Sequence, residues 1–270
     1  MKREQYIKEQ VLRHYNYIKD KYDVVYLGLQ GSQNYGLDVY DTDYKSDVDT
    51  KAIILPSFKD IVYNRQPVSK TVVLENDEHI DVKDIRVMFE NFKKQNINFL
   101  EILFTDFYVI NEEYKEDINY LRNSAEQIAR LNINQALRCM AGMSKEKLKA
   151  LKHPYPATIN KIEKYGYDPK QLHHILRMND FIKKYGIQNK KFKDCLIPDN
   201  KDYLIQIKKG LLDEQDATMI AENVDNDTYN VKEKLVTELD LINQTAIDIL
   251  NEIKYNILKQ KFKKELLEEN

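Results

Sequence analysis

Two aspartates separated by a single residue, Asp47 and Asp49, are the residues of this 270-residue chain best placed for chemistry. They open the run DVDTKAIIL at residues 47–55, whose β-branched and apolar residues predict a strand. Alternate side chains of a strand point to the same face, so the two carboxylates project together, about 6–7 Å apart, while Val48 points into the core. Paired carboxylates raise each other's pKa unless a cation lies between them, and such hard oxygen ligands suit Mg²⁺ or Mn²⁺.

A third carboxylate can join this pair from a neighbouring strand. Residues 70–75 and 79–85 predict a β-hairpin, and Asp81 lies in its second strand. If this strand pairs with the strand of the first two aspartates, all three carboxylates share one face, an arrangement typical of two-metal phosphoryl or nucleotidyl transfer. Asp84 and Glu78 are the alternatives for the third position, although Asp84 better suits the cap of a following helix and Glu78 lies near the turn.

Glycine is scarce and locally concentrated. The chain has 7 glycines, where average usage gives about 19, and Gly28, Gly31 and Gly36 fall close together. The run VVYLGL at residues 24–29 predicts a strand, after which Gly31 permits a turn and Ser32 suits the N-cap of a helix. Free N–H groups at a helix N-terminus bind phosphate, so Gly31 and Ser32 are candidate phosphate-binding residues.

The remaining periodicity predicts an α+β fold, with a small mixed β-sheet near the N-terminus followed by a mostly helical domain. We predict helices at residues 3–20, 113–142, 144–151 and 168–185, and one long helix from the apolar spacing of Leu235, Leu239, Ile242, Ala246, Ile249, Ile253 and Ile257. The corresponding domains are residues 1–110, which carry the aspartates, and the helical residues 111–270.

Composition excludes several classes of protein. Charged residues make up 32% and hydrophobic residues 42%, which is typical of a globular chain. No apolar run approaches the roughly 18 residues that span a bilayer, and residues 1–10 lack the apolar core of a signal peptide. Cys139 and Cys195 lack metal-type spacing and suit reduced thiols. We therefore expect a cytoplasmic protein that makes no use of membranes.

The net charge of −2 conceals an uneven distribution. Residues 145–193 hold 13 Lys and Arg against 4 Asp and Glu, whereas residues 213–240 hold 9 acidic residues against 2 basic ones. Two solvated helical faces would explain this distribution, and the basic segment would equally suit a nucleic-acid backbone. The acidic segment is interpreted as a solvated connection to the last helix.

Four strings in the chain carry a resemblance to a known family. They are GSQNYGL at residues 31–37, SDVD at residues 46–49, FLEILF at residues 99–104 and YGYDPKQLHHILR at residues 165–177. Their order resembles the polymerase-β-like nucleotidyltransferase superfamily, and the strings are similar to the bacterial and phage subfamily associated with RNA ligases. The resemblance covers residues 24–185.

Residue by residue, this resemblance implies catalytic and metal-binding roles for Asp47, Asp49 and Asp81. It implies that Gly31 and Ser32 grip a phosphate.

The distal string adds basic positions. The resemblance implies that Lys170, His174 and Arg177 bind the nucleotide, and spacings of four and three residues place them on one helical face. A packing role is the alternative for His174, and His173 is interpreted as structural because it points another way.

The activity implied by this resemblance is a Mg²⁺- or Mn²⁺-dependent transfer of NMP from an NTP, most simply ATP, to an acceptor hydroxyl, with release of pyrophosphate. Residues 1–110 would be the nucleotidyltransferase core, and residues 111–270 would complete the cleft. The expected acceptor is RNA, either a tRNA or another RNA end. Protein nucleotidylation and oligonucleotide second-messenger synthesis are alternatives, and a non-catalytic nucleotide-binding module is the contrasting class.

Overall fold

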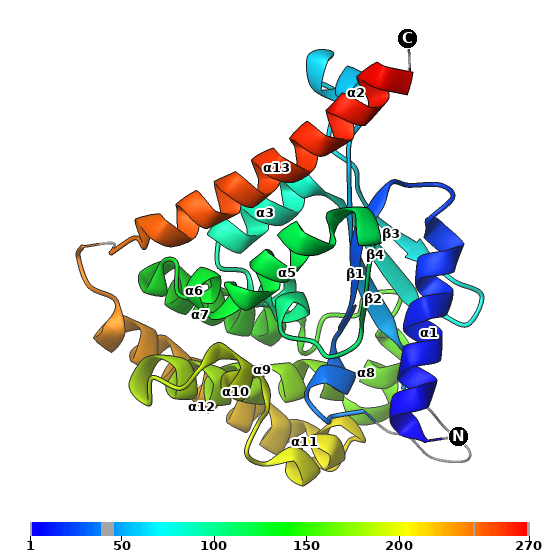
Figure 1. The fold of residues 1–270 in the computed structure, drawn as a ribbon. Coiled ribbons are helices and arrows are strands. Elements are labelled where there is room, and N and C mark those ends of the chain that lie inside the picture. The colour runs from blue at the N-terminus through cyan, green and yellow to red at the C-terminus, as the bar shows by residue number, and fades with distance from the viewer. Residues whose placement is uncertain (1, 39–45, 240, 269–270) are drawn as a thin grey trace. The chain divides into compact units, whose positions relative to one another are not determined.

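A computed structural model describes residues 2–38, 46–239 and 241–268, which divide into two compact units (Figure 1). Unit 1 comprises the described residues of Met1–Asn34, Val39–Leu131 and Asn243–Asn270, and unit 2 those of Tyr35–Asp38 and Asn132–Ile242. The division therefore differs from the boundary that we drew at residue 110. The last helix, which follows unit 2 in the sequence, packs against earlier helices of unit 1.

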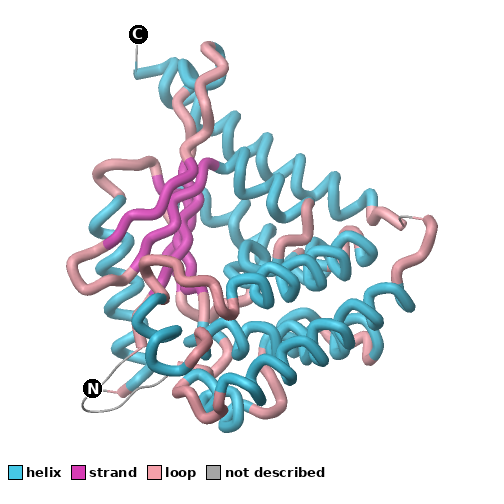
Figure 2. The backbone as a smooth tube through the Cα atoms, turned by 180° about the vertical axis from the view of Figure 1, so that it is seen from behind, coloured by secondary structure: helices cyan, strands magenta, loops and turns pink. Residues whose placement is uncertain are grey.

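Unit 1 is built on a five-stranded mixed sheet of order β3-β4-β2-β1-β5, whose strands are magenta in Figure 2. The strands are β1 (Val24–Gln30), β2 (Asp49–Ile54), β3 (Ser69–Val73), β4 (His79–Asp84) and β5 (Tyr108–Ile110). β2 and β4 run parallel, and the other three neighbouring pairs are antiparallel. The sheet confirms the α+β class and the predicted β3–β4 hairpin, while the short β5 was not predicted.

The two faces of this sheet have different environments. Helix α1 (Arg3–Ile18) lies on one face (Figure 1), where Ile7 and Val11 pack in one core with Val48 and Ala52 of the β2 segment and Val82 of β4. Because side chains alternate along each strand, the neighbouring acidic and basic residues of β2 and β4 project to the opposite face. Sheet alternation thus separates the core side chains from the candidate chemical groups.

The other elements of unit 1 are short, apart from the last helix. The α-helices are α2 (Phe58–Val62), α3 (Ile85–Lys93), α4 (Ile97–Leu100), α5 (Lys115–Asn123), α6 (Ala125–Ala129) and α13 (Gln244–Glu268). Three 3₁₀ turns accompany them, η1 (Ser32–Asn34), η2 (Glu101–Leu103) and η3 (Glu112–Tyr114). The predicted helix at 113–142 is wrong as one element. It breaks near Ser124, and α7 begins again after Asn132, whose side chain accepts a hydrogen bond from the Gln135 N–H group.

Unit 2 is helical. Its elements are α7 (Ile133–Ala150), α8 (Ile159–Tyr165), α9 (Pro169–Ile182), the π-helical segment η4 (Lys183–Ile187), α10 (Phe192–Leu196), α11 (Lys201–Lys208) and α12 (Glu214–Leu235). Leu172 and Ile175 of α9 form a core with Ile207 of α11 and Ala217 and Ala221 of α12. Within the described residues of both units, every helix is too short or too polar to cross a bilayer.

Two predictions for the C-terminal third were wrong. The acidic segment is not a solvated connection, because α12 covers most of it and buries small residues such as Ala217 and Ala221 against its neighbours. The last helix starts only at Gln244, so Leu239 and Ile242 lie before it and are exposed. The apolar spacing continued across the break by coincidence, since it carries no information on where a turn interrupts the helix.

Gly166 provides a direct test of the fold of unit 2. It ends α8 with φ = +78°, and a Cβ atom there would lie 2.5 Å from Oε2 of Glu214. We expect Gly166→Ala to lower the free energy of unfolding by about 1–3 kcal/mol, because strain and crowding both oppose the methyl group. Gly142 lies inside α7, where a Cβ atom would meet nothing within 4 Å.

The matched control is therefore Gly142→Ala, which should raise the free energy of unfolding by about 0.5–1 kcal/mol, since alanine is the better helix former. Urea unfolding followed by circular dichroism measures both changes. Equal effects of the two substitutions would contradict the left-handed cap at Gly166.

Candidate active site

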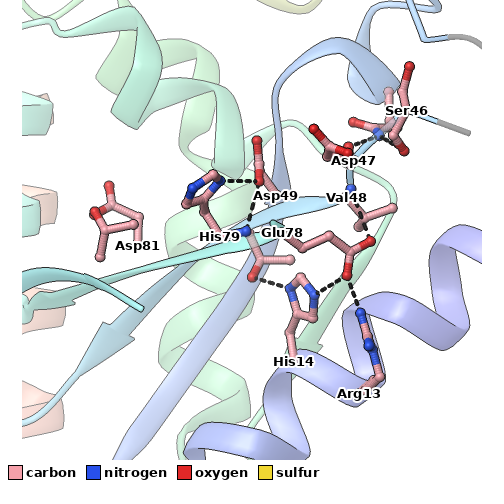
Figure 3. Close-up of polar contacts among 12 residues, drawn as sticks. Arg13, His14, Ser46, Asp47, Val48, Asp49, Glu78, His79 and Asp81 are labelled. Atoms are coloured by element: carbon pink, nitrogen blue, oxygen red, sulfur yellow. Dashed lines mark hydrogen bonds and ion pairs between the residues drawn. The ribbon is translucent and has the colours of Figure 1, made fainter. Parts of the chain in front are cut away.

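The two aspartates lie where β2 begins, on the face of the sheet away from α1 (Figure 3). Val48 between them is fully buried, as the alternation predicts, while Asp47 is exposed and the Asp49 side chain is 36% exposed. Both carboxylates can therefore meet a ligand from solvent without leaving the strand.

His79, and not Asp81, lies beside Asp49 (Figure 3). The backbone N–H group of His79 donates a hydrogen bond to Oδ1 of Asp49 at 2.9 Å, and Nδ1 of its ring lies 3.2 Å from the same oxygen. Two contacts on one oxygen fix the carboxylate and leave Oδ2 of Asp49 for another partner. Sequence reasoning missed this residue, although its place at the start of the second hairpin strand was visible.

Asp81 is held by two lysines. Its carboxylate oxygens lie 2.7 Å from Nζ of Lys51 and 2.7 Å from Nζ of Lys83. Burial raises the pKa of Asp81, but these two ammonium groups lower it by more, so the carboxyl stays ionised. Burial also lowers the pKa of Lys51 against the opposing effect of Asp81. The register of β2 and β4 places Lys51 directly opposite Asp81, so the pair belongs to the sheet itself.

These contacts decide which residues fit a divalent cation. Among the residues that the structure describes, no three His, Cys, Asp or Glu side chains are grouped as a metal site. Mg²⁺ is commonly held by one or two carboxylates and completes its shell with water and phosphate oxygens. Asp47 and Asp49 fit that pattern, whereas Asp81 would first have to give up Lys51 and Lys83.

A buried carboxylate, Glu78, holds the backbone between the two aspartates. Its Oε1 accepts a hydrogen bond from the Val48 N–H group at 3.2 Å, and its Oε2 lies 3.0 Å from Nε2 of His14 and pairs with Arg13. His14 is fully buried, and its other ring nitrogen, Nδ1, lies 2.9 Å from Oγ1 of Thr50. Glu78, which the sequence suggested only as an alternative ligand, is therefore already paired with groups of α1 and of the β2 segment.

The glycine turn after β1 is hydrogen-bonded to the segment that carries Asp47. Gly31 has φ = +88°, and its N–H group donates to Oε1 of the buried Glu101 at 3.2 Å. Gln33 donates from Nε2 to the carbonyl oxygens of Ser46 and Asp47. The expected helix after Ser32 is wrong: Ser32–Asn34 form one 3₁₀ turn, so no helix N-terminus is available for a phosphate there.

The string at residues 99–104 also has a structural explanation. Its Phe99 ring lies 4.1 Å from Nζ of Lys51, and its Glu101 receives the Gly31 N–H group. The two side chains thus connect this string to the strand of the aspartates and to the glycine turn.

The basic positions of the distal string gather in unit 2. Lys170 and Arg177 lie on α9, and Lys147 of α7 interacts electrostatically with both of them. Arg177 is 4% exposed, and its guanidinium group lies 4.3 Å from the centroid of the Tyr35 ring. Burial lowers the pKa of Lys147, and the nearby charges of Lys170 and Arg177 lower it further, as expected where like charges converge.

Both histidines of the distal string belong to this cluster. Their rings lie 5.3 Å apart, and burial with the charges of Arg177 and Lys170 lowers the pKa of His173 to about 3 and that of His174 well below its usual value. Both nitrogens of His173 are buried and find no hydrogen-bond partner among the described residues. Sequence reasoning treated His173 as pointing elsewhere and missed Lys147, because the approach of α7 to α9 is not visible in the sequence.

Three other residues of the distal string, Gly166, Tyr167 and Asp168, make structural contacts. Gly166 ends α8, the Asp168 side chain accepts from the Lys170 N–H group at 3.0 Å, and the Tyr167 hydroxyl donates to the Leu212 carbonyl at 3.1 Å. This part of the string therefore directs α9 into the core of unit 2.

Glu78 gives a pH-dependent prediction. Burial raises its pKa, but the hydrogen bonds and charge of His14 and its other donors outweigh burial and place the pKa below the ordinary 4.5. Its stabilisation is therefore complete above pH 4.5 and is lost as the pH falls through the folded-state value. Glu78→Gln should lower the free energy of unfolding at pH 7 by about 1–3 kcal/mol, with a difference from the unaltered chain that shrinks towards pH 3.

Urea unfolding at several pH values measures this difference. Glu9→Gln is the control, since Glu9 accepts a hydrogen bond from Gln5 on the exposed surface of α1, where a substitution should have little effect. A difference for Glu78→Gln that stays constant from pH 7 to pH 3 would contradict the buried carboxylate.

Comparison with known proteins adds little to this geometry. No family model matches the chain, and no curated protein matches it. Among solved structures, it is similar to a nucleotidyltransferase-like protein from Exiguobacterium sibiricum 255-15, with a TM-score of 0.29 and 9% sequence identity over 93% of this chain and 80% of that chain. Because the TM-score and the sequence identity are this low, this similarity carries no argument about function.

Proposed function

We propose that this protein is a nucleotidyltransferase that uses Mg²⁺ or Mn²⁺, transfers NMP from an NTP to an acceptor hydroxyl and releases pyrophosphate. The observation that carries the proposal is the pair at the start of β2, with Asp47 exposed and Asp49 partly exposed. Glu78 holds the backbone between the two aspartates, and His79 holds the carboxylate of Asp49. ATP is the simplest donor, and RNA is the proposed acceptor because residues 145–193 are strongly basic.

In this proposal Asp47 and Asp49 hold the cation. When bound, the cation neutralises charge on the triphosphate and favours the ionised form of the attacking hydroxyl. The acceptor oxygen forms a bond to the α-phosphorus, the bond from that phosphorus to the bridging oxygen breaks, and pyrophosphate leaves with the electron pair. The hydroxyl proton passes to solvent or to a neighbouring carboxylate. Glu78 and His79 keep the two aspartates in place during this exchange.

The phosphate groups need a positive partner as well. Lys147, Lys170 and Arg177 in unit 2 form a cluster of like charges, and such a cluster is relieved when an anion binds among them. We propose that this cluster binds phosphate groups of the donor or of the acceptor, with the neutral His174 as a further hydrogen-bonding group. Gly31 and Ser32 remain candidates for phosphate contact through the turn at the end of β1.

The first test of this activity is incorporation of label. The full chain with Mg²⁺ or Mn²⁺, each α-³²P-labelled NTP and tRNA should transfer label to RNA with release of pyrophosphate. Asp47→Asn and Asp49→Asn should each lower the rate at least about 100-fold, because each removes a carboxylate from the proposed cation site. Full activity in either folded variant would contradict the assignment.

Asp81→Asn separates the two interpretations of the third carboxylate. If Asp81 mainly balances Lys51 and Lys83, the variant should keep Mn²⁺ binding, measured by electron paramagnetic resonance, while Asp49→Asn loses it. Equal loss of Mn²⁺ in both variants would restore Asp81 as a metal ligand.

A nucleotide-binding protein without transfer activity is the second candidate. The lysine-bound state of Asp81 favours it, since two carboxylates are fewer than the three that the resemblance implies. Saturable NTP binding without label on RNA, on protein or in small products would support this function. Label on protein or in oligonucleotides would instead support the alternative acceptors.

The basic cluster yields a kinetic prediction. Lys170→Gln and Lys147→Gln should each raise the KM for NTP or for RNA about tenfold, which corresponds to about 1.4 kcal/mol of binding free energy. Lys149→Gln is the matched control, because Lys149 lies on α7 but is exposed and pairs with Glu146 at 3.1 Å. Unchanged KM values in the folded variants would assign these lysines to solubility alone.

A further inference from the structure

A groove between α7 and α12 lies entirely within unit 2, and of the basic segment 145–193 its lining includes Lys145. It has a volume of about 510 Å³, within the range of about 300–1,000 Å³ that is common for small-molecule sites. Helix α7 contributes Arg138, Gly142 and Lys145, and α12 contributes Asp225, Tyr229 and Lys232. Each set follows spacings of four and three residues, so each occupies one helical face.

The floor of the groove contains a glycine that the fold does not require. Of the seven glycines, all in the described part of the chain, four have positive φ, and at Gly28 and Gly186 a Cβ atom would lie within 3 Å of a neighbouring side chain. Gly142 shows neither feature: it lies inside an α-helix, and a Cβ atom there would meet nothing within 4 Å. Glycine costs about 0.5–1 kcal/mol relative to alanine in a helix, so its presence favours a ligand that approaches the backbone closely.

Positive charge lines the rim of this groove. Arg138 is exposed, and the Lys145 side chain is 59% exposed. The acidic residue of the groove, Asp225, is buried and accepts a hydrogen bond from the Ser144 hydroxyl at 2.7 Å, with its second oxygen 3.6 Å from Nζ of Lys145. The Asp225 carboxylate therefore connects α12 to α7. The three basic residues of the lining, Arg138, Lys145 and Lys232, outnumber this one acidic residue, so the groove is positively charged overall.

An aromatic side chain lies beside these cations. Tyr229 is 53% exposed, and Nζ of Lys232 lies 3.9 Å from the centroid of its ring. Nucleic-acid bases stack on exposed aromatic rings, and neighbouring cations bind the phosphate groups of the same nucleotide. A planar base and an anionic group are the two parts of a nucleoside phosphate.

We infer that the α7–α12 groove binds a nucleoside phosphate, with the base against Tyr229 and the phosphate between Arg138 and Lys145. The backbone at Gly142 forms the floor beneath the sugar. The bound unit is either a free mononucleotide or one nucleotide of an RNA strand. This site uses none of the residues assigned to the cation or to the basic cluster on α9, so it can be tested whether or not the chain transfers nucleotides.

Binding of two probes to the full chain tests the inference. AMP is measured by calorimetry and fluorescein-labelled octa-adenylate RNA by anisotropy, both in EDTA so that no cation site contributes. Gly142→Leu should weaken binding at least tenfold, because leucine fills the floor and is a good helix former that preserves α7. Tyr229→Leu should weaken binding to a similar extent, whereas Tyr229→Phe should preserve it, since the stacking surface remains.

A control variant and a comparison of the two probes identify the site and the source of the ligand. Lys149→Gln, on the same helix but outside the groove, should leave both affinities unchanged. The ligand is an RNA strand if octa-adenylate binds at least tenfold more tightly than AMP and this binding is lost in Gly142→Leu. Equal affinities for the two probes identify a free nucleotide. The inference is overturned if neither probe binds up to 10 mM AMP or about 100 μM RNA, or if binding survives in folded Gly142→Leu and Tyr229→Leu.

Discussion

The buried carboxylate of Glu78 must find partners for both oxygens, and those partners join three elements of unit 1. One oxygen takes the Val48 N–H group, and the other takes His14 and Arg13 of α1. Loss of the Val48 or the His14 contact would leave a polar group unpaired in the interior, which costs about 1–3 kcal/mol. The position of α1 against the sheet and the position of the Asp47–Asp49 segment therefore depend on one side chain.

The alternation of side chains along the strands then places core residues on one face of the sheet and charged residues on the other. Val48 enters the core below the sheet, while Asp49 and Lys51 on the same strand point to the other face. The charges on that face are mostly buried, so each needs a partner, and the parallel register of β2 and β4 supplies Asp81 for Lys51. Asp49 lies at the start of β2, keeps solvent exposure and, among the residues that the structure describes, accepts a hydrogen bond from the His79 N–H group. Two aspartates on neighbouring strands thus have opposite electrostatic surroundings.

Local patterns predicted much of this arrangement and long-range packing determined the rest. The alternation around Val48 and the hairpin before Asp81 depend on residues a few positions apart, so the sequence was sufficient for both. The partner of Asp81 depends on strand register, and the contact between Glu78 and His14 joins residues 64 positions apart, so neither was visible. The break between α12 and α13 was missed because apolar residues in a connecting segment continued the helical spacing by chance.

Neither unit is a continuous stretch of chain, and this affects how the protein can fold during synthesis. Unit 1 is interrupted by Asn132–Ile242 and regains its last helix, α13, only from Asn243 onward. All of the helices of unit 2 would therefore leave the ribosome before α3, α5 and α6 of unit 1 meet α13, whose buried residues include Ile253 and Ile257. Contacts between segments so distant in sequence form late, because the intervening loop must first be closed. The nascent chain would carry an incomplete first unit until α13 emerges.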